Sequence, residues 1–168
     1  MRKIRMMAWA VGAALVAWPA MVAGGQGPDV VTEIKGEVSP EDLEAQAQEL
    51  FEIPKKYGEA VKLYVRAANM REAGDPVRVT DLVMASRLAY YAGKEARAAE
   101  LMERAADEAH AAGDVVRAAN AYIDASFLAR EVGWELKVPE LVKKAQLLTA
   151  SPLIARSDRD AILARIEA

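Results

Sequence analysis

The sequence predicts an all-helical fold, and three observations support this. Alanine is the commonest of the apolar residues, which form 53% of the chain, while aromatic residues form 6%. Closely packed helices tolerate small side chains, whereas sheet cores favour β-branched and aromatic ones. A junction, Ala-Gly-Asp, occurs at residues 73–75 and again at 112–114, each time followed by a Val-Arg pair. Finally, the chain resembles itself at a fixed offset, which indicates a repeated helical unit.

Composition limits the function classes before any motif is considered. The 168 residues are enough for one domain, and 28% charged residues suit a folded chain. The sequence has no cysteine, which excludes disulfides, thiol catalysis, thiolate metal sites and lipid attachment to cysteine. Removing residues 1–23 would take the net charge from −3 to −6, because they carry three basic and no acidic residues. An acidic domain of this kind argues against nucleic acid as a partner.

The N-terminal residues have the pattern of a secretory signal peptide. Three basic residues within residues 1–5 precede an uncharged apolar run over 6–17, and Pro19 follows it. Small residues around Ala23 suit cleavage, so we expect 1–23 to be removed and the protein to be exported to the periplasm. The alternative is an uncleaved membrane anchor, since 6–23 is close to the shortest spanning length. We expect residues 24–38 to form a flexible tether, and the alternative is that residues 29–34 add a strand to the edge of a partner's sheet.

The helices are predicted from their start and stop residues. Ser39 and Pro40 suit a helix start that runs to about Ile53-Pro54. A second helix is expected over 55–73 and ends at Gly74, a residue that readily adopts the left-handed conformation. Asp75-Pro76 starts the next helix, and Gly93, Gly113 and Gly133 are expected at or beside later helix ends. The last helix is expected to begin at Ser157, with Asp160 completing a capping box.

The repeat is clearest at an offset of 40 residues. This offset aligns nine identical residues within one hairpin length, including Ala85 with Ala125 and Ser86 with Ser126. An offset of 38 relates the preceding segment more weakly, pairing Ala47 with Ala85. Three related helical hairpins are therefore predicted, with Ala85 and Ala125 buried where helices cross.

The residue pattern of these hairpins resembles that of the tetratricopeptide repeat (TPR) family. First helices carry a large residue, a small pair and a further contact residue, as in Leu82, Ala85-Ser86 and Ala89. Second helices alternate small, large and small residues, as in Ala60, Tyr64 and Ala67 and in Ala98, Met102 and Ala105. The resemblance implies a TPR-like alpha-solenoid over 39–168, a right-handed array of about three antiparallel hairpins plus a C-terminal capping helix. A more general alpha-solenoid is the alternative, because the spacing of about 39 residues exceeds the family's 34.

Residue types that carry catalysis are sparse. His110 is the only histidine, so a histidine-based zinc site has no second imidazole, and we expect His110 on the surface near a helix end. Glu95 and Glu100 are interpreted as solvated charges rather than as a glycosidase pair. The sequence contains no phosphate loop and no serine-centred elbow. We therefore expect no catalytic, cofactor-binding or metal-binding residues, and no enzyme activity.

The predicted function is binding of another protein or an extended peptide in the bacterial cell envelope. In the TPR family the first helices line a concave groove, and the resemblance implies an equivalent surface here. Its residues mix arginine with aromatic and polar side chains, as binding surfaces do. Two alternatives are an accessory subunit of an envelope enzyme or assembly and a self-associating structural protein. The candidate groove comprises Thr80, Val83, Arg87, Tyr90, Tyr91, Asn120, Ile123, Phe127 and Arg130.

Overall fold

The computed structural model describes residues 38–167, and every regular element in that range is helical. The elements are α1 (Pro40–Glu49), the 3-10 turn η1 (Pro54–Lys56), α2 (Tyr57–Met70), α3 (Pro76–Tyr91), α4 (Glu95–Ala111), α5 (Val115–Glu131), α6 (Lys137–Thr149) and α7 (Arg156–Glu167). The all-α prediction is therefore confirmed for these residues. The predicted signal peptide (1–23) and, apart from Val38, the predicted tether (24–38) lie outside them.

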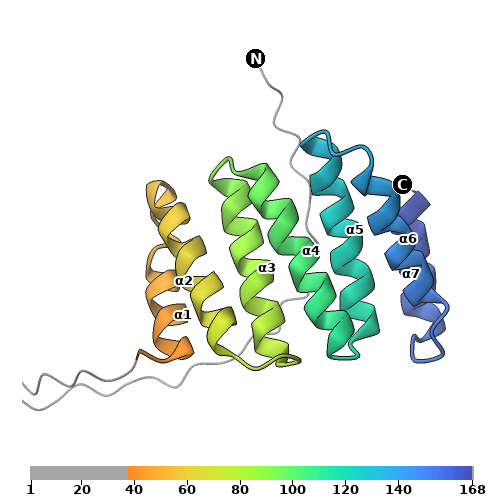
Figure 1. Ribbon diagram of the computed structural model, residues 1–168, viewed down its shortest axis with the longest axis horizontal. Coiled ribbons are helices and arrows are strands. Elements are labelled where there is room, and N and C mark those ends of the chain that lie inside the picture. Colours follow the sequence, from red (N-terminus) through yellow and green to blue (C-terminus); the bar gives the residue numbers. More distant parts are fainter. Residues whose placement is uncertain (1–37, 168) are drawn as a thin grey trace, which may run out of the picture. The chain divides into compact units, whose positions relative to one another are not determined.

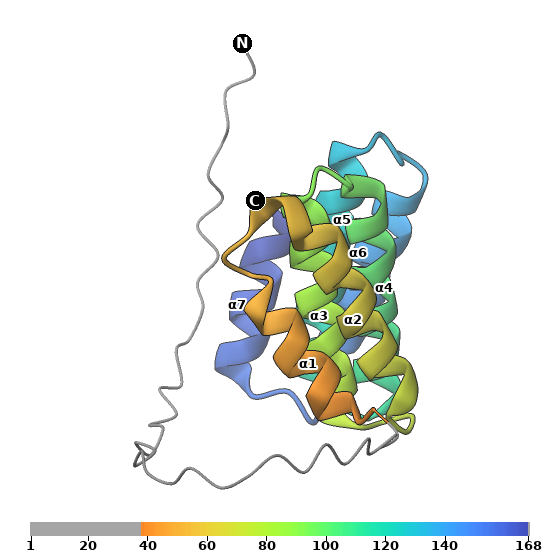
Figure 2. The ribbon, with the colours of Figure 1, turned by 90° about the vertical axis from the view of Figure 1, so that its left-hand side faces the viewer.

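Within this range each helix packs against the next one along the chain. Figure 1 shows α1 to α6 following one another side by side in sequence order. Viewed from the α1 end, α1 and α7 lie towards one side, and α4 lies towards the other (Figure 2). Helix α7 contacts α5 as well as α6, the helix that precedes it in the chain. None of the helices described in 38–167 is both long and apolar enough to span a membrane.

The predicted start residues cap their helices. The Ser39 hydroxyl accepts a hydrogen bond from the Asp42 amide at 3.1 Å, and the Asp42 carboxylate accepts one from the Ser39 amide at 3.0 Å. The Asp75 carboxylate accepts from the Val77 amide at 2.8 Å, so it satisfies a helix N–H group that has no partner within α3. These short polar side chains fix where α1 and α3 begin.

Left-handed glycines follow α3, α4 and α5 as the sequence predicts, but α2 ends early. Gly74, Gly93, Gly113 and Gly133 all have positive φ, between 70° and 86°. Gly93, Gly113 and Gly133 lie just beyond a helix, whereas α2 ends at Met70 and not at the predicted residue 73, so Gly74 lies in the turn before α3. This conformation strains residues with a Cβ atom, so glycine is favoured at these positions.

Three further predicted boundaries are wrong by a few residues. Helix α1 ends at Glu49 rather than near Ile53, and residues 54–56 form a 3-10 turn before α2 starts at Tyr57. Helix α7 begins one residue before Ser157, so Ser157 lies inside its first turn. The Ala155 carbonyl accepts the first helical hydrogen bond, from the Arg159 amide at 3.0 Å. The cap position is therefore Ala155.

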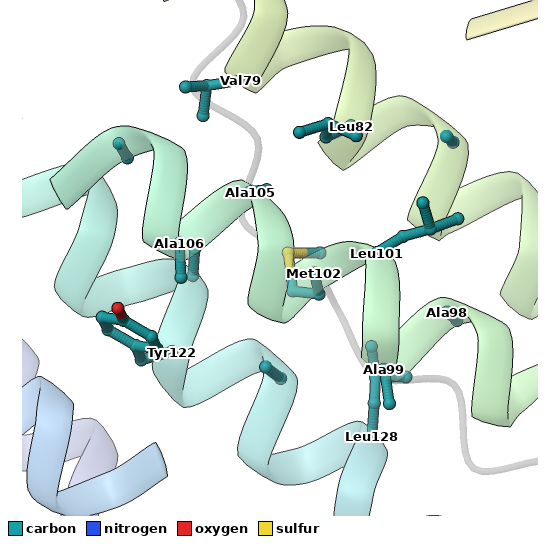
Figure 3. Packing of buried hydrophobic residues seen from close by; sticks show 14 of the residues in the cluster. Val79, Leu82, Ala98, Ala99, Leu101, Met102, Ala105, Ala106, Tyr122 and Leu128 are labelled. Carbon is teal, nitrogen blue, oxygen red and sulfur yellow. The ribbon is translucent and has the colours of Figure 1, made fainter. Parts of the chain in front are cut away.

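The core consists largely of alanine with a few large side chains between helices. Ala85 and Ala125 are completely buried, as the repeat predicts. Figure 3 shows larger neighbours from three helices, among them Leu82 of α3, Met102 of α4 and Tyr122 of α5. Small residues let helix backbones approach closely, and the large side chains fill the space that remains.

Candidate functional site

The predicted groove residues lie on α3 and α5, and most of them have surface access. Thr80, Tyr91 and Arg130 are exposed, with Tyr91 at 61% of its full accessibility. Five further members are half-buried: Val83, Arg87, Tyr90, Asn120 and Phe127. Spacings of three and four residues place Thr80, Val83, Arg87 and Tyr90 along one side of α3. We call these eight residues the α3–α5 face.

Interactions between α3 and α5 bring the two halves of this face together. The Arg117 guanidinium donates to the Pro76 carbonyl at 3.1 Å, near the start of both helices. Further along, burial raises the pKa of Asp124 on α5, and the positive charges of Arg165 and of Arg87 on α3 oppose this rise. Glu131, the last residue of α5, faces Tyr90, whose pKa is raised chiefly by burial and then by the Glu131 charge. The two helices therefore interact near their starts, further along and at their ends.

Ile123 is a correction to the predicted surface. It is 1% exposed and belongs to the hydrophobic core, so it cannot contact a partner in this structure. The physical reason is that the Ile123 side chain packs into the core between the helices and does not point to solvent. Its neighbours Asn120 and Asp124 keep partial access and bind the α7 side chain Arg165.

Three tyrosines form an aromatic cluster at one end of the α3–α5 face. The Tyr91 ring lies 6.2 Å from Tyr90 and 6.3 Å from Tyr57, measured between ring centroids. Tyr64 and Tyr122 lie elsewhere and are both buried. Tyr57 is instead half-buried and in ring contact with the exposed Tyr91. Tyr57 lies at the start of α2, just after η1, and the helical periodicity of the sequence does not indicate its contact with Tyr91.

A second aromatic contact lies on α5. The Arg130 guanidinium lies over the Phe127 ring at 5.9 Å from its centroid, within cation–π range. Phe127 packs with one side against the hydrophobic core and is half-buried. The face thus presents aromatic rings and arginines together, a composition that protein interfaces favour.

Helix α7 binds directly to the α5 half of the face. The Arg165 guanidinium donates from Nη1 to the Asn120 side chain and from Nη2 to the Asp124 carboxylate. The Asn120 amide nitrogen donates to the Val116 carbonyl at 3.0 Å, which turns its oxygen away from its own helix towards Arg165. Burial raises the pKa of Asp124, and the charges of Arg165 and Arg87 oppose that shift. The sequence gave no sign of this contact, because Asn120 and Arg165 are 45 residues apart.

Other charged clusters link helices rather than form a reactive site. Arg71, at the end of α2, pairs with four carboxylates, those of Glu41, Glu44, Asp75 and Asp81. His110 is exposed in the last turn of α4, as predicted. Among the described residues, no three histidine, cysteine or acidic side chains are grouped closely enough to hold a metal ion.

Comparisons with known proteins leave the chain without an assigned relative. No family model, no curated protein and no solved structure matches it.

Proposed function

We propose that this chain is a non-catalytic binding module of the bacterial cell envelope that recognises another protein or a peptide through the α3–α5 face. On this proposal the folded part is a TPR-like array of three antiparallel hairpins, α1–α2, α3–α4 and α5–α6, with α7 as a C-terminal cap. Export through residues 1–23 would place it in the periplasm.

Support for the repeated hairpin comes from equivalent positions in α3 and α5. Both helices begin at an aspartate cap that follows a left-handed glycine, and both are followed by another such glycine. Ser86 and Ser126, which are 40 residues apart, are both buried, as are Ala85 and Ala125. Matching caps, ends and buried small residues are expected where one structural unit recurs.

The observation that carries the binding proposal is the aromatic and arginine surface itself. Tyr91 is the most exposed tyrosine described, and its ring contacts those of Tyr57 and Tyr90. Arg130 and Phe127 add a cation–π pair on the neighbouring helix. Rigid, partly buried aromatics beside arginine are the usual anchors of protein recognition.

Site-specific photo-crosslinking in the native envelope tests this proposal. A photoreactive amino acid at Tyr91 is expected to capture a discrete partner, while the same group at Leu147, exposed on α6, captures none. Arg130→Ala should weaken capture at Tyr91 at least fivefold, whereas the exposed control Arg97→Ala on α4 leaves it unchanged. Equal capture at Tyr91 and Leu147, or no effect of Arg130→Ala, would contradict the proposal.

A further inference from the structure

One arginine of α7 binds two acceptors on α5. Asn120 and Asp124 are four residues apart on α5, so their side chains are neighbours on one side of the helix. A single guanidinium reaches both, using two different nitrogens. The planar fork of arginine suits two separate acceptors, whereas a lysine ammonium is a single point charge.

The acceptor pair is held in place by groups other than α7. The Asn120 side chain is oriented by its own hydrogen bond to the Val116 carbonyl on α5. Asp124 also interacts with the positive charge of Arg87 on α3. If Arg165 were removed, the bond to the Val116 carbonyl would still orient the Asn120 side chain, and Arg87 would still lie near the Asp124 carboxylate. We therefore expect the acceptor pair to keep its arrangement without Arg165.

Helix α7 itself is only lightly anchored. Ile162 is its one fully buried residue, and Leu163 and Ile166 are half-buried. The Arg165 side chain retains 38% of its accessibility although it forms the polar contact to α5. By comparison, α3 and α5 each bury many more of their residues than α7 does. The contact therefore resembles a docked peptide helix more than a core helix.

We infer that the Asn120–Asp124 pair is a receptor site for a helical segment that carries an arginine between aliphatic residues, and that α7 occupies this site in the free protein. The spacing in α7 defines the expected partner: an aliphatic residue three positions before the arginine and another directly after it, as in Ile162, Arg165 and Ile166. The inference rests on the proposed function, which it deepens by naming a helix, and not an extended peptide, as the partner.

The physical consequence is competition between α7 and an external helix. Because α7 is tethered next to the site, its effective concentration is high and it lowers the apparent affinity for any ligand in solution. Loosening α7 should raise that affinity without any change to the acceptor pair. A lone arginine-bearing helix can then bind in place of α7.

The experiment uses the full chain and a labelled synthetic peptide of residues 152–168, with binding followed by fluorescence anisotropy. The Arg165→Ala chain is expected to bind this peptide at least tenfold more tightly than the wild-type chain does. Adding Asp124→Ala to that chain should abolish the gain. A peptide with lysine in place of its arginine should bind the Arg165→Ala chain at least fivefold more weakly.

A second variant loosens α7 while leaving all polar partners intact. Ile162→Ala removes the buried anchor of α7 and should also raise peptide affinity. Equal peptide affinity for the wild-type and both variant chains, or no preference for arginine over lysine, overturns the inference. Loss of cooperative folding in either variant overturns it too, because α7 would then be an essential part of the core.

Failure of this inference and failure of the proposed function can be told apart. If photo-crosslinking at Tyr91 captures a partner but the peptide binds no variant, the ligand uses the α3 half of the face and α7 is a permanent cap. If the peptide binds the variants but Tyr91 captures nothing, the receptor site stands and the wider binding surface does not.

Discussion

The first and last described helices are both fixed by one arginine, but to very different degrees. Arg71 holds α1 to the start of α3, with its side chain 11% exposed and four carboxylates around it. Arg165 holds α7 to α5 through one carboxylate and one amide, and is 38% exposed. Neither end helix buries much apolar surface: Leu43 and Ala47 in α1, Ile162 in α7. The polar contacts therefore add to a limited apolar packing at each end, and they differ in burial and in the number of partners.

Burial explains why the two contacts differ in strength. A shielded guanidinium among carboxylates interacts in a low effective dielectric, and removing it strands the charges that it neutralised. A solvent-accessible pair is weakened by water and salt and contributes little. From this comparison we expect α1 to behave as a fixed part of the fold and α7 to open more readily.

The largest expected effect follows from removing Arg71. Arg71→Ala leaves Asp81 buried without a cation, next to Glu44, and should lower the free energy of unfolding by about 3 to 5 kcal/mol. Urea denaturation measures this change. The matched control is Arg97→Ala, since Arg97 and Glu100 form an exposed pair and their loss should cost less than about 1 kcal/mol. Similar losses in both variants would remove the distinction between buried and exposed arginines.

The second prediction concerns pH and Asp81, which is 2% exposed. Burial, followed by the negative charge of Glu44, raises the pKa of Asp81 from 3.8 to about 6, while Arg71 opposes the shift. The folded chain then holds this proton more tightly than the unfolded chain, so this contribution to stability is present below pH 4 and is lost as pH rises through 6. Over that range the loss amounts to about 2 to 3 kcal/mol.

Asp81→Asn should remove this pH dependence while keeping an oxygen that can accept from Arg71. The variant is expected to match or exceed the wild-type stability at pH 7, and to lose the decline between pH 4 and 7. Thermal or urea unfolding across that range provides the measurement. A wild-type chain that gains stability as pH rises from 4 to 7 would show that the Arg71 pairing outweighs the burial of Asp81.

A third prediction uses the middle of the row as a reference for the two ends. Ala125 is completely buried, so Ala125→Leu should overpack this crossing and cost about 1 to 3 kcal/mol. The equivalent enlargement at the exposed Ala161 of α7 should cost almost nothing. Equal tolerance at both positions, measured by chemical unfolding, would mean that helices do not pack closely at Ala125.

The smallest expected effect is at the α7 end. Arg165→Ala should reduce the free energy of unfolding by only about 1 kcal/mol, because the guanidinium is partly solvated. Hydrogen exchange should localise the change to α7, with α1 to α4 unaffected. A global loss comparable to that of Arg71→Ala would show that both ends are equally firm.

Features set by neighbouring residues could be predicted from the sequence. Ser39 caps α1 because its acceptor serves an amide three residues away, and Gly74 follows α2 because a local left-handed turn requires it. Ala85 and Ala125 were predicted as buried from their repeat positions alone, and both are buried. Each of these inferences needs only a few adjacent residues or a fixed period.

Features set by residues far apart in the chain could not be predicted. Arg71 and Glu44 are 27 residues apart, and Arg165 and Asp124 are 41 apart, with nothing in either local pattern to connect them. Asp81 is an acidic residue that nothing in the local sequence marks as buried, yet it is buried and paired with Arg71, ten residues before it. Ile123 occupies a surface position in the predicted stripe, yet it is buried in the core that the packed helices form together.

Native-state hydrogen exchange of the wild-type chain tests the central claim most directly, because it compares the two ends in one molecule. The account predicts that the amides of α7 exchange through local opening at least tenfold faster than those of α1, and that α1 opens together with α2 and α3. Protection of α7 equal to that of α5 and α1 would contradict it, since both ends of the row would then be fixed parts of the fold.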